Sequence, residues 1–244
     1  MLIETRLKDN FKKDNFFQHS KTLYIIDDYN IMGMKKEALD FYSDNFDKVG
    51  CNTIHIYFQV DFEKDVMFDY LINDLANACD INQEVFHSIY TVLHTNFYFN
   101  FNSKDNQVNS KEAFENAFIS TLKKCLWKLN SAIKFIENMN ILGIYVDLIP
   151  FSDSKIEPPP FHGRYWLSIS DDKKDGNGYI VDASLNTFGK GRIFAQLMDK
   201  ENFDLLRDFF YKAIETSKLN VRIGIEDLKR FKYNLQRILK YYRH

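Results

Sequence analysis

The sequence has few cysteines, and they lie far apart. Its 244 residues contain Cys51, Cys79 and Cys125, and no two of them form a C-x-x-C pair. A zinc site or a disulfide framework calls for closely spaced or paired cysteines, so neither is indicated. We expect reduced, buried thiols, which behave as small hydrophobic side chains.

The chain also lacks a strong net charge and a long apolar run. Its formal net charge is -2, so any contact with nucleic acid must come from a local basic patch. No apolar run approaches the roughly 20 residues that cross a bilayer. Residues 1–15 lack the apolar core of a signal peptide. These absences predict a cytoplasmic protein with no membrane partner.

Internal repeats and linker-like composition are absent as well, which predicts a single domain over 1–244. The apolar stretches 21–30 and 53–60 read as strands. Between them, 36–49 has apolar residues at helical spacing and is followed by Gly50, which predicts a helix that ends there. A strand, a short helix and a strand predict a parallel pair with a right-handed crossover.

The rest of the chain predicts further helices and strands. We expect a helical insertion over about 62–138, a strand over 141–149, and a basic amphipathic helix over about 225–244. Two strands at 163–170 and 178–183 are expected to form a hairpin with its turn at 174–178. A third strand is expected at 192–198, followed by a helix that Asp199 caps and that runs to Lys212. The predicted fold class is α/β, a mixed sheet flanked by helices.

Groups able to bind phosphate gather between 158 and 197. His162 and Arg164 are two residues apart on a predicted strand, so their side chains share one face. Ser184 and Asn186 are spaced in the same way near the next strand. A neutral imidazole attacks phosphorus or relays a proton, and a guanidinium fork fits two phosphoryl oxygens. Together they predict a compact pocket for an oxyanion.

This stretch resembles one catalytic half of the phospholipase D superfamily. Members carry H-x-K, then four residues and an aspartate, then a G/S-S-x-N element about one hairpin later. The resemblance implies a phospholipase D-like fold and His162 as the nucleophile that forms a phosphohistidine. A second histidine would protonate the leaving oxygen. Arg164, Ser184 and Asn186 would hold the phosphoryl group and Gln196 would orient the histidine, without a metal or another cofactor.

Since only one such motif occurs, a working site implies a homodimer that brings together two copies of His162. Small single-motif members of the superfamily resemble bacterial nucleases, including those of restriction and phage-defence systems. We therefore expect a nucleic-acid substrate, DNA more than RNA; the chain has no apolar interfacial helix that would favour a phospholipid. The residues expected to contact its phosphates are Lys190, Arg192, Lys229, Arg230 and Arg237.

Two positions depart from the superfamily pattern. Arg164 replaces the usual lysine, and Ile169 stands where the aspartate belongs, with Asp171 two residues later. These departures keep open a catalytically degenerate domain that binds nucleic acid or serves as a subunit of a larger assembly. A phospholipid hydrolase is a further alternative.

Simpler structural roles are also open for the same residues. In that case Arg164 pairs with Asp182 or Asp147 and has no part in catalysis. Asp27, which ends the first strand, is expected to be solvated or to cap a helix rather than to bind a metal. The basic C-terminal helix would pack its apolar stripe and leave its lysines in solvent, which is compatible with phosphate contacts.

Overall fold

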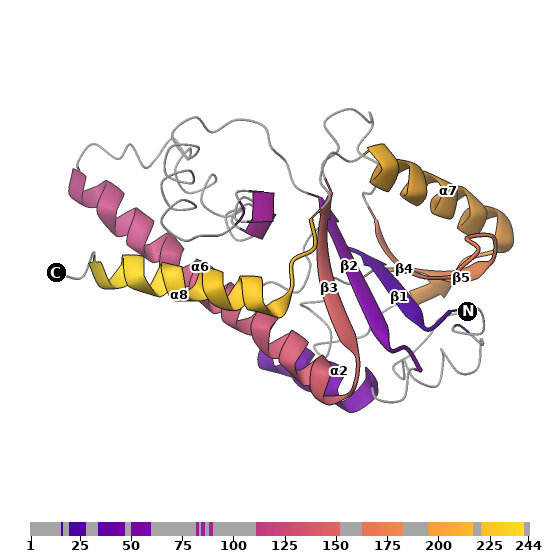
Figure 1. Cartoon of the computed structure of the whole chain (residues 1–244), viewed down its shortest axis with the longest axis horizontal. Helices are drawn as coiled ribbons and strands as arrows, with labels where there is room; N and C mark the ends of the chain where they lie inside the picture. The colour runs from indigo at the N-terminus through magenta and orange to yellow at the C-terminus, as the bar shows by residue number, and fades with distance from the viewer. Residues whose placement is uncertain are drawn as a thin grey trace.

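The computed structural model describes residues 16, 20–27, 34–46, 50–59, 82, 84–85, 88–89, 111–151, 163–182, 195–216 and 221–241. At 45, 59, 111–118, 121, 216 and 241 it describes the backbone alone. Within these residues, four long helices flank a sheet of six strands (Figure 1).

The sheet has the strand order β3-β2-β1-β4-β5-β6. Its strands are β1 (Thr22–Ile26), β2 (Thr53–Gln59), β3 (Tyr145–Phe151), β4 (Arg164–Ile169), β5 (Gly176–Val181) and β6 (Ala195–Leu197). The strands β1, β2 and β3 are parallel, and β4, β5 and β6 extend the sheet in antiparallel pairs. This mixed sheet with flanking helices confirms the predicted α/β class.

The first strand, helix and strand form the predicted parallel unit. β1 pairs with β2 so that Thr22 lies opposite Thr53. The helix between them, α2 (Lys36–Asn45), ends earlier than the expected position 49. Its apolar stripe of Ala38, Leu39 and Tyr42 is buried, because these side chains belong to the main hydrophobic core.

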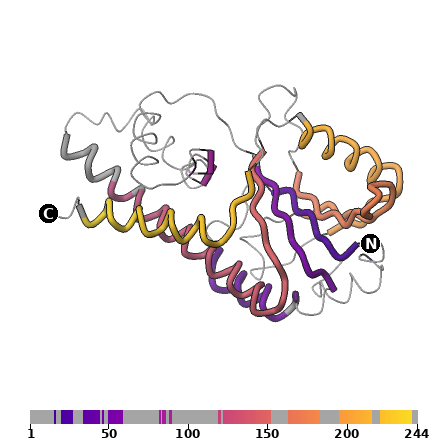
Figure 2. The backbone as a smooth tube through the Cα atoms, in the orientation of Figure 1, coloured from indigo at the N-terminus to yellow at the C-terminus, as the bar shows by residue number. Residues whose placement is uncertain are grey.

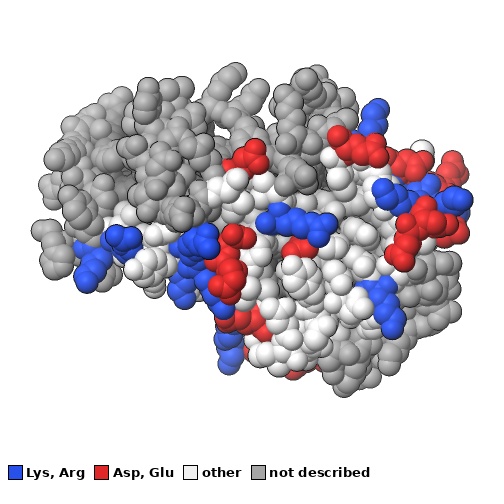
Figure 3. Space-filling model, in the orientation of Figure 1, with Lys and Arg blue, Asp and Glu red and all other residues white. Residues whose placement is uncertain are grey.

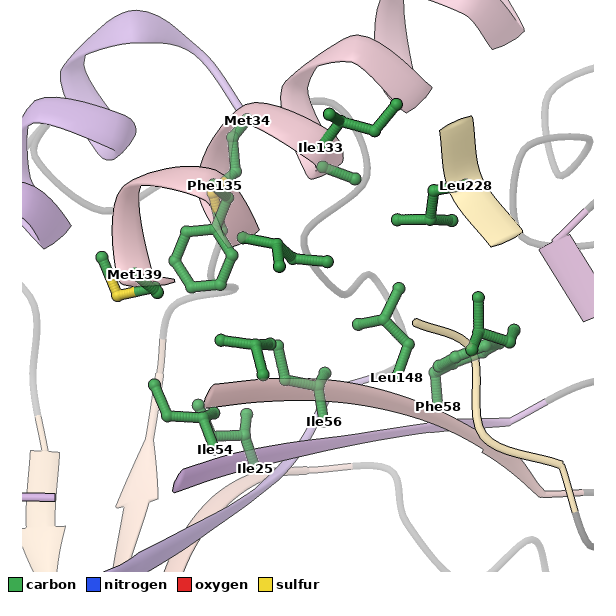
Figure 4. Close-up of a cluster of buried hydrophobic side chains, with 14 of the residues drawn as sticks. Ile25, Met34, Ile54, Ile56, Phe58, Ile133, Phe135, Met139, Leu148 and Leu228 are labelled. Carbon is green, nitrogen blue, oxygen red and sulfur yellow. The ribbon is translucent and has the colours of Figure 1, made fainter. Parts of the chain in front are cut away.

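The long helix α6 (Lys111–Ile141) connects β2 to β3. Its buried side chains, which include Ile133 and Phe135, join the same core as Ile54 and Ile56 of β2 (Figure 4). The last part of the expected insertion, 62–138, thus belongs to a crossover helix whose side chains form part of the main core. Of the preceding residues, 60–110, most lie outside the described part.

The strand expected at 141–149 begins later, so that boundary was wrong. Ile141 is the last residue of α6, and Gly143 follows with a positive φ of 74°. The N–H of Ile144 then donates to the carbonyl of Met139 at 2.9 Å, which closes the helix end. At its other end β3 includes Pro150, which the end strand of a sheet tolerates, because no described strand pairs with the outer side of β3 at this residue.

The helices form one layer on each face of the sheet. The face that carries Leu23 and Ile25 packs against α2, α6 and α8 (Ile225–Tyr241), and we call it the three-helix face. The face that carries Ile26 and Leu167 packs against α7 (Lys200–Thr216), and we call it the α7 face. The backbone trace shows α6 and α8 running alongside each other (Figure 2).

The strands β4 and β5 form the predicted hairpin, with Arg164 opposite Val181. The turn, however, is Ser170 to Asp175, and the expected turn glycines Gly176 and Gly178 belong to β5. A Cβ at Gly176 would lie 2.2 Å from the Ser168 carbonyl oxygen. This glycine therefore serves close backbone packing rather than the turn.

The two C-terminal helices begin close to their expected positions. Asp199 caps α7, since its Oδ1 accepts the N–H of Asn202 at 2.8 Å, and α7 continues past Lys212 to Thr216. β6, expected at 192–198, is described only at Ala195–Leu197. α8 buries Leu228, Phe231, Leu235 and Leu239.

Candidate functional site

The strand order changes direction between β1 and β4. From β1 the chain proceeds to β2 and β3 on one side, whereas β4, β5 and β6 extend the sheet on the other. In open α/β sheets, ligands bind outside the carboxyl ends of the strands at such a switch point. Ile26 at the end of β1 pairs with Tyr165 at the start of β4. We call this place, with the adjoining end of β5, the switch-point edge.

A buried carboxylate and a guanidinium meet at the switch-point edge. Asp27 directly follows β1 and is 1% exposed, and Arg164 is the first residue of β4. The Arg164 Nε lies 3.6 Å from the Asp27 Oδ1. The N–H of Asp27 donates to the Tyr57 carbonyl at 3.1 Å, which joins the end of β1 to β2. Because a buried carboxylate needs a partner, Asp27 holds Arg164 in place.

Arg164 is also held by the neighbouring strand. Its Nη1 donates to the main-chain carbonyl of Asp182, just after β5, at 3.3 Å. The side chain is still 29% exposed, so two neighbours orient it while part of it reaches the surface. A guanidinium fixed in this way offers a planar set of donors to a phosphate.

These contacts decide between the simpler expectations for the two residues. Arg164 contacts the main chain of Asp182 and the carboxylate of Asp27, whereas Asp147 lies on the α7 face. The expectation that Asp27 is solvated or caps a helix was wrong. It is buried, and the N-cap of α2 is Lys35, which makes no capping bond through its side chain.

Asp27 also affects the pKa of a tyrosine in α2. Burial raises the pKa of Tyr42 in α2 well above its ordinary value, and the negative charge of Asp27 raises it further. Tyr42 therefore stays protonated at neutral pH. In the described part of the chain, the Asp27 carboxylate thus lies near both the Arg164 guanidinium and the neutral phenol of Tyr42 in α2.

Several of the predicted site residues lie outside the described part of the chain: His162, Ser184, Asn186, Lys190 and Arg192. Their described neighbours Gly163 and Asp182 both adjoin the switch-point edge, since Arg164 pairs with Val181. The chain therefore enters β4 and leaves β5 at this edge.

The structure does not bring Gln196 to the same side as Arg164. Arg164 is in register with Val181 and Ala195, whereas Gln196 is in register with Ile180 and Tyr165. Neighbouring positions on a strand point to opposite faces, so Gln196 belongs to the α7 face. Ile169 likewise lies on the α7 face, 1% exposed among the side chains that pack against α7.

A second polar cluster, which the sequence did not suggest, lies on the α7 face. The Asp147 Oδ2 lies 3.4 Å from the His55 Nδ1 and 3.5 Å from the Arg222 Nη1. Burial lowers the pKa of His55, against the attraction of Asp147, and Arg222 lowers it further. A hydrogen bond to Asp147 raises the pKa of Tyr145. In the sequence, His55 stands between two isoleucines and Asp147 between a valine and a leucine. This alternation is the signal that could have placed both polar side chains on the face opposite these apolar neighbours.

The basic residues of α8 lie on its outer side. Lys229, Arg230 and Arg237 are exposed, and Lys229 forms an ion pair with Glu137 of α6 at 3.3 Å. The apolar side of the helix is buried, as expected, and α6 is the helix that it packs against. These three residues are thus on a surface separate from Arg164, which lies at the end of the sheet.

No family model, curated protein or solved structure matches this chain. Among the described residues, no group of three or more His, Cys, Asp and Glu side chains is placed to hold a metal ion. None of the described helices combines the length and the apolar character needed to cross a membrane.

Proposed function

We propose that the chain is a metal-independent phosphodiesterase, a nuclease that acts as a homodimer with a site at the switch-point edge. The observation that carries the proposal is the placement of Arg164. It is held by Asp27 and by the Asp182 carbonyl at the end of a β-hairpin, where the superfamily motif has its cation. The motif residues themselves come from the sequence resemblance.

In the proposed reaction, the imidazole of His162 attacks phosphorus, which forms an N–P bond as the P–O bond to the leaving strand breaks. The second copy of His162 donates a proton to the leaving oxygen. In the second step, the second copy of His162 takes a proton from water as the water oxygen bonds to phosphorus and the N–P bond breaks. This releases the phosphate monoester and returns both imidazoles to their starting protonation states. Arg164 stabilises the negative charge that develops on the phosphoryl oxygens in both steps.

The direct test is cleavage of labelled single-stranded DNA and RNA in the presence of EDTA. We expect wild type to cleave, His162→Ala to be inactive and Arg164→Ala to be about 100- to 1,000-fold slower. Light scattering should report a dimer. A monomeric protein, or cleavage that survives His162→Ala, would contradict the mechanism.

Ile169 favours a second candidate, a degenerate domain that binds nucleic acid without cleaving it. The position that holds an aspartate in the superfamily here belongs to an apolar core, on the face opposite Arg164. Binding of DNA by wild type with no cleavage in the same assay would support this candidate. Hydrolysis of phospholipid vesicles in place of nucleic acid would instead support the phospholipid hydrolase.

A further inference from the structure

The outer side of α8 combines positive charge with an exposed aromatic ring. One side of this amphipathic helix is buried against α6, and its other side is open. Apart from one adjacent pair, the basic and aromatic residues at the open side are three or four positions apart, so they share one face of the helix. We call them the α8 stripe, and they are Lys229, Arg230, Tyr233, Arg237 and Lys240.

Tyr233 lies at the centre of the α8 stripe. It is 60% exposed, and the Arg237 guanidinium lies over its ring, 5.8 Å from the ring centre. A large aromatic side chain at this position contributes little to the packing of α8 on α6. Arg230 and Arg237 are one turn away on either side, so the ring is flanked by guanidinium groups.

In the described ranges of the chain, carboxylates pair with the α8 stripe near the start of the helix but not further along it. Near the start of the helix, Lys229 forms ion pairs with Glu137 and Glu226. Further along, Arg237 and Lys240 have no carboxylate partner among the residues that the structure describes. Figure 3 shows Lys and Arg side chains gathered along α8.

The neighbouring part of α6 has the same character. The Lys229–Glu137 ion pair places the start of α8 beside the end of α6, and the two helices run in opposite directions (Figure 1). Lys123, Lys124 and Trp127 lie further back along α6, in the direction in which α8 runs. Both lysines are exposed, and Trp127 is 52% exposed. The basic and aromatic character thus continues beyond α8.

We propose that the α8 stripe binds single-stranded nucleic acid, with an unpaired base stacked on Tyr233 and phosphates contacted by the basic side chains. Interleaved cations and aromatic rings suit single strands, because each base has a face that stacks whatever its sequence. A duplex keeps its bases stacked inside, so it has no free base face for Tyr233. From Lys229 to Lys240 the stripe is about 16 Å long, enough for a few nucleotides.

This inference rests on the proposed function, because it takes the substrate of the nuclease to be a nucleic acid. It adds a place where the strand is held away from the switch-point edge. Binding and cleavage would then be separable, since the α8 stripe and Arg164 lie on different parts of the molecule. A variant of either one should change one measurement more than the other.

The test is fluorescence anisotropy with a short labelled oligothymidylate, its RNA counterpart and a blunt duplex. All proteins carry His162→Ala, so that cleavage does not interfere. We expect Tyr233→Ala to bind either single strand about 5- to 150-fold more weakly, as expected for the loss of one stacked base. Tyr233→Phe should bind like the parent, and affinity for the duplex should not change with Tyr233→Ala.

Matched controls come from the opposite side of the molecule. Tyr145→Ala removes a tyrosine of similar exposure, 58%, and should leave binding unchanged. The pair Arg230→Gln and Arg237→Gln should reduce the slope of log affinity against log salt by about 1.4, whereas Arg222→Gln should not alter it.

The proposal is overturned if folded Tyr233→Ala, judged by circular dichroism, binds the single strands as tightly as the parent. It is also overturned if the parent binds neither strand, or binds the duplex more tightly. A failed nuclease assay with intact, Tyr233-dependent binding would refute the proposed catalysis alone. Cleavage by wild type, together with binding that Tyr233→Ala does not weaken, would refute this inference alone.

Discussion

Two buried carboxylates, Asp27 and Asp147, lie in or next to parallel strands of the same sheet, and each meets an arginine. Asp27 follows β1 on the three-helix face, where Arg164 starts β4. Asp147 is inside β3 on the α7 face, with Arg222 and His55. The arginines differ in exposure, 29% for Arg164 and 71% for Arg222.

The difference lies in what each carboxylate connects. Asp27 connects β1 to β4 at the switch point, the kind of place where open α/β sheets bind ligands. Asp147 joins β3 to the segment before α8 through its contact with Arg222. The next residues, Leu148 and Ile223, form a bridge at the outer side of β3. A buried charge pair by itself is therefore weak evidence of a site, and its place in the topology decides.

The largest effect on stability is expected when Asp27 is removed. Asp27→Ala leaves the less exposed arginine without its carboxylate and should lower the free energy of unfolding by about 3 to 5 kcal/mol. Asp147→Ala should cost less, about 1.5 to 3 kcal/mol, because the more exposed Arg222 can be hydrated. Urea denaturation of both variants measures the difference. Equal losses would remove the distinction drawn between the two carboxylates.

Activity should separate the two arginines more clearly than stability does. Under the proposed function, Arg164→Ala should lower kcat/KM by about 100- to 1,000-fold. Arg222→Ala is the matched control and should retain activity within about twofold, as expected for a position outside the proposed site. An equal loss in both would place the site elsewhere.

The pH dependence of stability should come from the Asp147 cluster. Because burial lowers the pKa of His55, the unfolded chain binds a proton more readily than the folded one. Stability should be complete above about pH 6.5 and should fall as the pH drops from there through the folded pKa. Thermal melts of wild type and His55→Gln across this range measure the effect. If the slope of wild type is unchanged in the variant, His55 is not its source.

The smallest effect on stability is expected at Tyr145, which lies at the edge of the Asp147 cluster. Tyr145→Phe removes one hydroxyl that donates to Asp147 and should cost about 0.5 to 1.5 kcal/mol. Because Tyr145 is more than half exposed, the lower end is expected. Tyr233→Phe, on the exposed side of α8, is the control and should be neutral in the same urea titration.

Much of the fold was predictable because local patterns were strong. The alternation and apolar runs of 21–30 and 53–60, with a helical stripe between them, predicted a parallel unit that the structure confirms. The hairpin was predicted from two apolar runs, but its turn was misplaced. Gly176 reads as a turn glycine in sequence, whereas its role is close contact with Ser168, which depends on the neighbouring strand.

The candidate site was only partly predictable. Residue spacing was enough to predict a strand that contains Arg164 and a C-terminal helix with one apolar and one basic side. The contact between Asp27 and Arg164, and the placement of Gln196 on the opposite face, could be found only in the folded chain. Strand order and register set these relations, and they depend on pairing between residues far apart in the chain.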